Sequence, residues 1–167
     1  MQGQRVLVTG GAGFIGSNLA NHLAADNDVI ALDDGYLGTP TNLDDDVTFV
    51  EASVLDDDLP ADVDVCVHLA ARVNVEGFVN TVEQVREEGC DTVVYASTSS
   101  IYGDRTEPTP EELPVTVNTG YEASKLARER YGECYANYHG MNMAGLRFFP
   151  CIRATAALKH TKASTPT

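Results

Sequence analysis

Short apolar runs alternate with longer amphipathic segments along this chain, which is the pattern of strands that alternate with helices. Each run is rich in β-branched or aliphatic residues and is bounded by glycine or polar residues, as buried strands are. The predicted strands are residues 6–8, 29–32, 47–50, 63–69, 92–96 and 143–149. Apolar residues at helical spacing predict helices over residues 14–25, 75–88 and 121–138. Residues 35–46 and 103–118 are rich in turn formers and are expected to be loops.

This order of elements predicts an α/β fold. Strand–helix–strand units cross over with a right hand and place their strands parallel, so we expect a Rossmann-like, doubly wound parallel sheet with helices on both faces. The 167 residues, of which 43% are hydrophobic, suffice for one such domain, which we assign to residues 1–150. Residues 151–167 hold three bases and no acid, unlike the rest of the chain. We predict that this basic tail is disordered or non-native.

The charge balance excludes several partners. The chain has 25 acidic and 11 basic residues, for a net charge of −14, and up to Ala71 it has thirteen acids and one base, Arg5. Such a surface repels the phosphates of nucleic acids and anionic lipids, so we expect neither nucleic acid nor membrane as a partner. We expect a cytoplasmic protein, because no apolar run approaches ~20 residues and no signal peptide is present. Abundant Asp with little Lys favours a halophilic cytoplasm, with an ordinary acidic cytosolic protein as the alternative.

Side chains that often bind metals are scattered along the chain. The four cysteines form no C-x-x-C pair, and no two of the four histidines share the spacing of metal ligands, so we expect no metal site. His68 lies inside a predicted strand and is interpreted as a packed strand residue. Tyr131, Tyr135 and Tyr138 follow helical spacing and are interpreted as a core or interface stripe.

A glycine-rich loop joins the first predicted strand to the first predicted helix. Residues 9–16 are TGGAGFIG, in which Gly11, Gly13 and Gly16 fit G-x-G-x-x-G, while Gly10, Gly13 and Gly16 fit G-x-x-G-x-x-G. Glycine permits the backbone conformations and close approaches that binding a pyrophosphate requires. The N-terminus of the following helix offers unpaired N–H groups and the positive end of its dipole to the phosphates. Together these features predict a dinucleotide site.

Asp33 lies at the end of the second predicted strand, twenty residues after Gly13. A carboxylate at this place accepts hydrogen bonds from the ribose hydroxyls and repels a 2′-phosphate. No Arg or Lys lies between Arg5 and Arg72 to bind such a phosphate. The expected cofactor is therefore NAD rather than NADP. Asp34 takes this role if the strand ends one residue later.

Candidate chemistry gathers at the carboxyl ends of later strands, where ligands of open α/β sheets bind. Small residues and hydroxyls mark two such ends, Leu69-Ala70-Ala71 and Ser97-Thr98. Tyr121 and Lys125 are spaced i,i+4, so they share one face of a predicted helix. The phenol is a weak base at neutral pH, but a nearby ammonium favours the phenolate. An isolated pair at this spacing would be an ordinary surface pair, whereas beside a dinucleotide loop it indicates a catalytic site.

The chain resembles the extended short-chain dehydrogenases/reductases of the NAD-dependent epimerase/dehydratase family. The resembling segments cover about residues 5 to 149 and are VTGGAGFIGSNLA, LDDGYLG, HLAA, VVYASTSSIYG, YEASK and LRFF. The resemblance implies that Gly10, Gly13 and Gly16 hold the pyrophosphate beside the backbone of Phe14 and Ile15. The other cofactor contacts it implies are Asp33, Asp34, Ser53, Val54, Leu69, Ala70, Ala71, Ser97, Tyr121, Lys125 and Phe148.

The resemblance also implies a reaction. Tyr121 would be the base, Lys125 would bind the nicotinamide ribose, and Thr98 would polarise the substrate. These roles indicate an NAD-dependent epimerase whose partner is a nucleotide sugar, with a UDP-sugar as the expected substrate. A homodimer through the two long helices is expected. The alternatives are a non-catalytic NAD-binding module and a sugar-nucleotide dehydrogenase or reductase.

The chain departs from the family pattern in four places. Ser53 replaces an acid that meets the adenine, and Ser99-Ser100 replace the Asp-Glu that dehydratases carry after the catalytic Thr. Only Arg72 and Val73 remain where relatives have several helical turns. Pro150 replaces an Asn after L-R-F-F, and the substrate-binding part that follows it in relatives is absent or unrelated. We therefore expect the cofactor site to be nearly complete and the sugar site to be mostly absent.

Overall fold

The computed structural model describes residues 1–71, 75–103 and 109–150, which form one six-stranded parallel sheet with helices. Its strands are β1 (Arg5–Thr9), β2 (Asp28–Asp33), β3 (Thr48–Glu51), β4 (Val65–His68), β5 (Thr92–Thr98) and β6 (Asn142–Phe148). Its helices are α1 (Phe14–Leu23), α2 (Glu76–Glu87) and α3 (Gly120–His139), with short 3-10 helices η1 (Pro40–Asn42) and η2 (Ser99–Tyr102). The predictions for residues 72–73 and for the basic tail lie outside the described residues.

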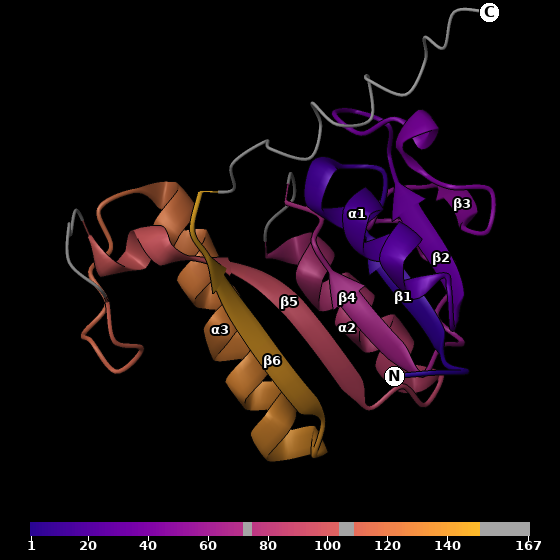
Figure 1. The fold of residues 1–167 in the computed structure, drawn as a ribbon. Coiled ribbons are helices and arrows are strands. Elements are labelled where there is room, and N and C mark those ends of the chain that lie inside the picture. The colour runs from indigo at the N-terminus through magenta and orange to yellow at the C-terminus, as the bar shows by residue number, and fades with distance from the viewer. Residues whose placement is uncertain (72–74, 104–108, 151–167) are drawn as a thin grey trace, which may run out of the picture.

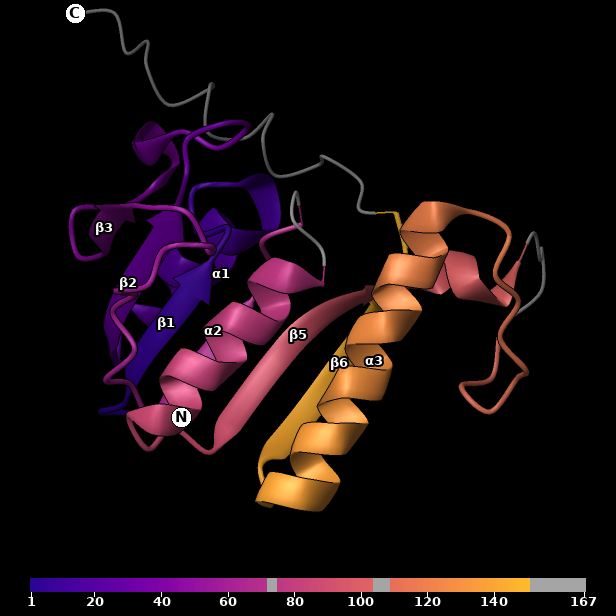
Figure 2. The same ribbon diagram turned by 180° about the vertical axis from the view of Figure 1, so that it is seen from behind.

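Helices cover both faces of the sheet. Helix α1 lies on one face, and α2 and α3 lie on the other (Figures 1 and 2). Two apolar clusters correspond to these two layers: one joins Phe78 and Val82 of α2 to Leu7 of β1, and the other joins Ala20 of α1 to Val8. The predicted class, a Rossmann-like doubly wound sheet, is therefore confirmed.

The strand order is β3-β2-β1-β4-β5-β6. After β1 the chain adds β2 and β3 on one side, and it then crosses to the other side of β1 to add β4, β5 and β6, so the order of the strands reverses between β1 and β4. Thr9 at the end of β1 pairs with Leu32 on one side and with His68 on the other. A change of direction opens a crevice at the carboxyl ends of the two central strands, where open α/β sheets bind ligands. The fold thus places the glycine loop after β1 at the edge of that crevice.

The fourth strand differs from its prediction. The sequence predicts a buried strand over residues 63–69, whereas β4 covers only Val65–His68, in which Cys66, Val67 and His68 are all buried. Successive residues of β4 are buried because a central parallel strand is covered by other elements on both faces. His68 is fully buried, as expected, and its Nδ1 lies 3.0 Å from Thr9 Oγ1.

Helix α3 carries its own start and stop signals. The Thr119 hydroxyl accepts a hydrogen bond from the Glu122 N–H, and the Glu122 carboxylate accepts one from the Thr119 N–H. This capping box satisfies N–H groups that would otherwise lack partners. Gly140 ends the helix with φ of +70°, a conformation that favours glycine. Of the predicted tyrosine stripe on α3, Tyr135 is buried, whereas Tyr131 and Tyr138 are exposed.

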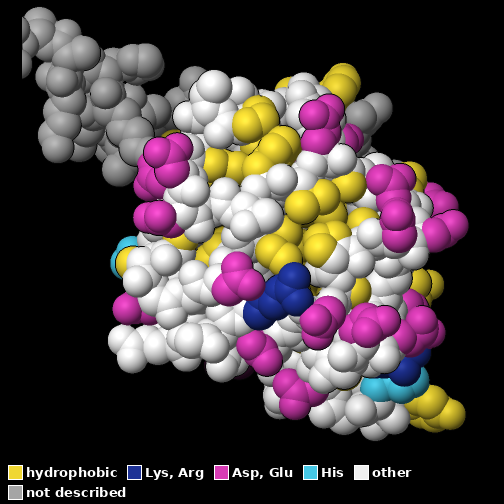
Figure 3. Space-filling model, turned by 90° about the vertical axis from the view of Figure 1, so that its right-hand side faces the viewer, with side chains coloured by type: hydrophobic (Ala, Val, Ile, Leu, Met, Phe, Trp, Pro, Cys, Tyr) yellow, Lys and Arg dark blue, Asp and Glu magenta, His cyan; other side chains and the backbone are white. Residues whose placement is uncertain are grey.

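Figure 3 shows the side of the molecule that carries β3, an edge strand of the sheet. Hydrophobic side chains gather in the middle of this side, acidic side chains lie around them, and basic side chains are sparse. Among the described residues, no helix combines the length and the apolar character needed to span a membrane.

Candidate functional site

The glycine loop wraps tightly around the start of α1. Gly10 has φ of +70°, and a Cβ there would lie 2.9 Å from the Ala70 backbone nitrogen. A Cβ at Gly16 would collide with the Gly10 carbonyl oxygen, so this glycine permits close packing of helix on loop. A Cβ at Gly13 would meet only the Gly10 oxygen, at 3.2 Å. Gly13 therefore leaves open space at the helix N-terminus, where an anion binds best.

Asp33 connects this loop to the second strand. Its buried carboxylate accepts hydrogen bonds from the Ala12 N–H, at 3.1 Å, and from the Gly35 N–H, at 3.0 Å. Because β2 ends at Asp33, this acid rather than Asp34 lies at the strand end. The Asp34 side chain is exposed and accepts a hydrogen bond from the Tyr36 N–H, at 3.1 Å.

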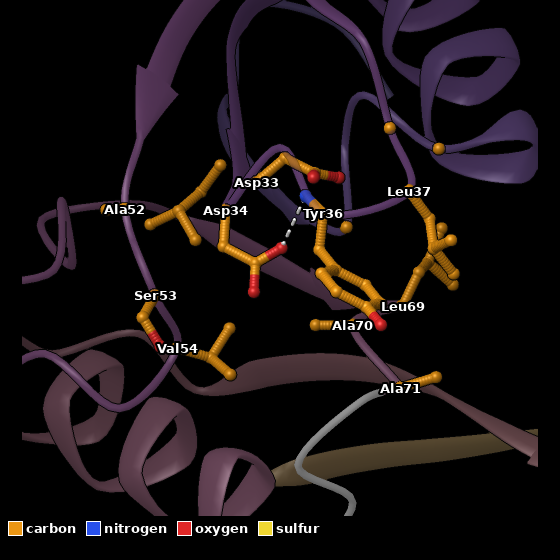
Figure 4. Close-up of a pocket in the computed structure, with 14 residues that line it drawn as sticks. Asp33, Asp34, Tyr36, Leu37, Ala52, Ser53, Val54, Leu69, Ala70 and Ala71 are labelled. Carbon is orange, nitrogen blue, oxygen red and sulfur yellow. Dashed lines mark hydrogen bonds between the residues drawn. The ribbon is translucent and has the colours of Figure 1, made fainter.

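A cavity of about 200 Å³ opens beside Asp33 (Figure 4). Its lining includes nine residues predicted from the sequence: Gly10, Gly13, Asp33, Asp34, Ser53, Val54, Leu69, Ala70 and Ala71. The sequence-based set missed five others: Leu32, Tyr36, Leu37, Gly38 and Ala52. Four of the missed residues belong to the LDDGYLG segment, which carries the family resemblance and so held a usable signal. The mostly apolar walls with two acids at one end suit an adenosine, so the residues present fit the dinucleotide.

Ser53 is already engaged within its own turn. Its N–H donates to the Asp56 carboxylate at 2.8 Å, and its hydroxyl oxygen accepts from the Leu55 N–H at 3.2 Å. Beside it, Val54 is buried and contributes an apolar wall. Next to Ser53, which stands where the family pattern has an acid, the pocket therefore offers the aliphatic surface of Val54 and no carboxylate.

The end of β5 presents two hydroxyls with different partners. Thr98 caps η2, since its hydroxyl oxygen accepts from the Ser100 N–H at 3.2 Å. Ser97 donates to the Glu129 carboxylate at 2.5 Å, so it is directed toward α3. Phe148 pairs with Thr98 across the strands and lines a separate hollow with Tyr102. Neither hydroxyl lines the cavity beside Asp33, and Phe148 does not either.

Tyr121 and Lys125 lie together on α3, as their spacing predicts. The Lys125 Nζ lies 5.7 Å from the centre of the Tyr121 ring, and half of the tyrosine is exposed. Lys125 itself is buried, and its Nζ donates to the Ala96 carbonyl oxygen at 3.3 Å. Burial, followed by the charge of Arg128, lowers the pKa of Lys125 to about 7.

Sequence reasoning missed three further charged side chains near this pair: Arg128, Glu129 and Arg147. Arg128 is fully buried one turn after Lys125, and burial lowers its pKa to about 10. Glu129 receives two hydrogen bonds from the Arg147 guanidinium, at 2.9 and 2.7 Å. Arg147 also donates to the Tyr102 hydroxyl at 2.6 Å, so one network joins β5, β6, α3 and η2. No pattern in the sequence marked these contacts, because their partners are distant along the chain.

The fold and this site define a dinucleotide-binding Rossmann domain: a parallel sheet with a glycine loop at its switch point and an acid at the end of β2. Residues 6–155 match the sequence pattern described as the NAD dependent epimerase/dehydratase family. The chain belongs to this family.

Named relatives agree with this assignment. The chain is 34% identical over 166 residues to a putative UDP-glucose 4-epimerase of Methanocaldococcus jannaschii, covering 86% of this chain and 54% of that protein. It is 37% identical over 166 residues to a UDP-glucose 4-epimerase of Mycolicibacterium smegmatis, covering 83% and 53%. The structure of Thermus thermophilus UDP-glucose 4-epimerase in complex with NAD superimposes with a TM-score of 0.73 at 31% identity, covering 86% and 54%. The chain thus spans about half the length of the curated relatives it matches.

Proposed function

We propose that this chain is the cofactor-binding part of an NAD-dependent nucleotide-sugar epimerase of the UDP-glucose 4-epimerase type. One observation carries the proposal: the glycine loop and Asp33 line one cavity after β1 and β2, and Lys125, beside Tyr121, reaches the Ala96 carbonyl near the carboxyl end of β5. Relatives that are named as UDP-glucose 4-epimerases support the choice of reaction. The relative of known structure that was crystallised with NAD supports the choice of cofactor.

The adenosine half of the cofactor is assigned to the cavity beside Asp33. The carboxylate of Asp33 binds the ribose hydroxyls, and Val54, Leu37 and Leu69 enclose the adenine. Gly13, at the start of α1, would hold the pyrophosphate, because the helix dipole and the backbone N–H groups of the first turn favour negative charge. Bound NAD supplies a hydride acceptor and donor at its nicotinamide ring.

The protein's own part in the reaction is to move one proton. Tyr121 takes the proton from a sugar hydroxyl, and its half-exposed position leaves the phenol accessible to a substrate. The positive charge of Lys125, 5.7 Å from the ring, favours the phenolate form that the base requires. Thr98, at the end of β5, polarises the same oxygen. Ser99 and Ser100 follow Thr98 and carry no acid, which favours epimerisation over loss of water.

Binding of NAD is the first test, because all the assigned cofactor contacts except Phe148 lie between Gly10 and Lys125. Calorimetric titration of the 167-residue chain in molar salt is expected to show NAD binding. The control is Asp33→Arg, which should lose most of the affinity for NAD. A folded sample without measurable NAD binding would refute the assignment.

The reaction is tested separately. The family resemblance assigns sugar-nucleotide contacts to residues beyond Phe149, so we expect the 167-residue chain to turn over UDP-sugars poorly or not at all. The protein at its natural length, isolated from its own cells, should interconvert UDP-glucose and UDP-galactose without accumulating NADH. Loss of this activity in Tyr121→Phe supports the base, and unchanged activity would exclude it. Accumulation of NADH would instead indicate a dehydrogenase.

Two further properties belong to the same proposal. We propose a homodimer that pairs through α2 and α3, where Tyr131 and Tyr138 leave aromatic surface exposed. A molar mass from light scattering decides between one copy and two. We also propose a salt-rich cytoplasm as the place of action, from the net charge of −14.

A further inference from the structure

Two positive side chains share one acceptor beneath the nicotinamide end of the proposed site. The Nζ of Lys125 donates to the Ala96 carbonyl oxygen at 3.3 Å, and the guanidinium of Arg128 donates to the same oxygen at 3.4 Å. The two residues are spaced i,i+3 on α3, so they lie on one face of the helix. Both side chains are almost completely buried, with exposed fractions of 2% and 0%. Two cations are therefore held close together in a medium that screens charge weakly.

Arg128 is fixed by contacts on three other elements. A second guanidinium nitrogen donates to the Ala70 carbonyl oxygen at 2.8 Å, just after β4. The guanidinium carbon lies 5.8 Å from the centre of the Phe78 ring, which belongs to α2. A planar guanidinium held at several points loses little freedom when it forms each bond, so its position is well defined. Arg128 thus connects Ala70, which lines the cavity, with β5, which contains Ala96.

Only one member of this pair, Lys125, can lose its charge near neutral pH. A guanidinium keeps its proton at any ordinary pH, whereas an ammonium loses it readily when buried. Among the residues that the structure describes, the other ionisable groups shown to interact with the pair are Tyr121 on α3 and His68 on β4. Burial, followed by the charges of Arg128 and Lys125, keeps the pKa of His68 well below its ordinary value, so this ring is neutral and adds no charge. Repulsion between the two cations therefore changes the protonation of Lys125 rather than that of Arg128.

We propose that Arg128 is a positioning residue for Lys125: it anchors the shared carbonyl of Ala96 and, in addition to burial, its adjacent guanidinium disfavours the charged form of the lysine amine. This inference rests on the proposed function, because Lys125 matters to the reaction only if it meets the cofactor and Tyr121. Lys125 then carries its proton below about pH 7 and loses it above that pH in the cofactor-free protein. Arg128 acts on the reaction only through Lys125.

The direct test is a nuclear magnetic resonance titration of Lys125 in the cofactor-free chain, with 13C and 15N labels. The wild-type amine should titrate near pH 7, and a midpoint near that of free lysine, ~10.4, would overturn the proposal without any variant. In Arg128→Met the midpoint should rise by at least about 1 pH unit. Arg128→Lys, which restores a positive charge, should return it toward the wild-type value. Arg130→Met, which removes an exposed arginine from the same helix, is the matched control and should leave it unchanged.

A second readout links Arg128 to the cofactor. If the ammonium of Lys125 donates to the nicotinamide ribose, NAD binds wild type more weakly as the pH rises through 7, by up to about tenfold per pH unit. In Arg128→Met this loss should move to higher pH, whereas a folded variant with the wild-type profile would contradict the inference. Absence of NAD binding at every pH would refute the proposed function instead, and the titration of Lys125 would still test the role of Arg128.

Discussion

The carboxylate of Asp33 accepts a hydrogen bond from the backbone N–H of Ala12 at 3.1 Å, so the acid that ends β2 also holds the glycine loop that follows β1. The other carboxylate oxygen accepts from the Gly35 N–H at 3.0 Å. A Cβ at Gly38 would lie 2.9 Å from both carboxylate oxygens, so the turn after β2 packs directly against them. Asp33 therefore shapes the cavity in addition to facing it.

Replacing Asp33 should affect stability as well as binding. Asp33→Ala removes a charged acceptor from the buried N–H of Ala12 and the partly buried N–H of Gly35, and we expect it to lower the free energy of unfolding by about 2 kcal/mol. Asp34→Ala is the matched control, because the exposed neighbour accepts one bond in a local turn. Chemical denaturation followed by circular dichroism measures both. Equal stability of the two variants would contradict the bridging role of Asp33.

Alanine should act differently at two glycines of the same loop. Gly16→Ala introduces a Cβ that collides with the Gly10 carbonyl, so we expect a lower Tm together with weaker NAD binding. Gly13→Ala brings its Cβ to 3.2 Å from that carbonyl, a milder contact, so the Tm should fall less than in Gly16→Ala, while NAD binding should be lost because the methyl group occupies the space for the pyrophosphate. Thermal melts and calorimetry separate the two effects. If Gly13→Ala binds NAD normally, the pyrophosphate lies elsewhere.

An acid at position 53 should strengthen cofactor binding. In Ser53→Asp a carboxylate can accept a hydrogen bond from the adenine amino group, and it can still accept from the Leu55 N–H as Ser53 does. We expect NAD affinity to rise by about threefold to tenfold, which corresponds to the net value of one hydrogen bond. Nicotinamide hypoxanthine dinucleotide, which lacks that amino group, is the control ligand and should gain nothing. A gain shared by both dinucleotides would indicate a different cause.

The Glu129–Arg147 ion pair should make stability depend on pH. Burial raises the pKa of Glu129, but the hydrogen bonds from Arg147 and Ser97 outweigh it and hold the pKa below its ordinary value. The ionised form is therefore favoured in the folded state, and its contribution is complete above the ordinary carboxyl pKa of ~4.3 and is lost as the pH falls through the lower folded value.

Two variants test this ion pair. We expect Arg147→Met to lower the free energy of unfolding by about 2–3 kcal/mol at neutral pH, because it leaves a mostly buried carboxylate without its partner. Glu129→Gln should lose less stability than wild type when the pH is lowered from 5 to 3. Arg130→Met, at an exposed pair on the same helix, should change neither quantity appreciably. Denaturant melts at several pH values provide the measurement.

Salt should stabilise the folded chain. Thirteen acids and one base precede Arg72, so raising the ionic strength screens repulsion among like charges. We expect the Tm to rise as KCl increases from 0.1 M to 2 M, and the increase at low salt should be the steepest because screening acts there first. A Tm that does not change over this range would exclude a salt-adapted surface.

The sequence by itself determined the fold class and the cofactor loop. Apolar periodicity is a local property, and it identified all six strands and three helices of the described residues to within a few positions. The glycine spacing and Asp33 also lie within one strand–helix–strand unit, so a short segment carries their whole signal. The same holds for Tyr121 and Lys125, which one helical turn brings together.

Only the tertiary structure decided which distant groups meet. Arg128 and Lys125 reach the carbonyl of Ala96 because α3 packs on β5, and Arg147 reaches Glu129 because β6 pairs beside β5. Their separations of 18 to 32 residues along the chain leave no periodic mark. Burial then shifts the pKa of Lys125, and burial depends on how elements pack rather than on neighbouring letters. For that reason the sequence identified nine of the fourteen residues that line the cavity, together with Tyr121 and Lys125, while the charges around them emerged only from the packed fold.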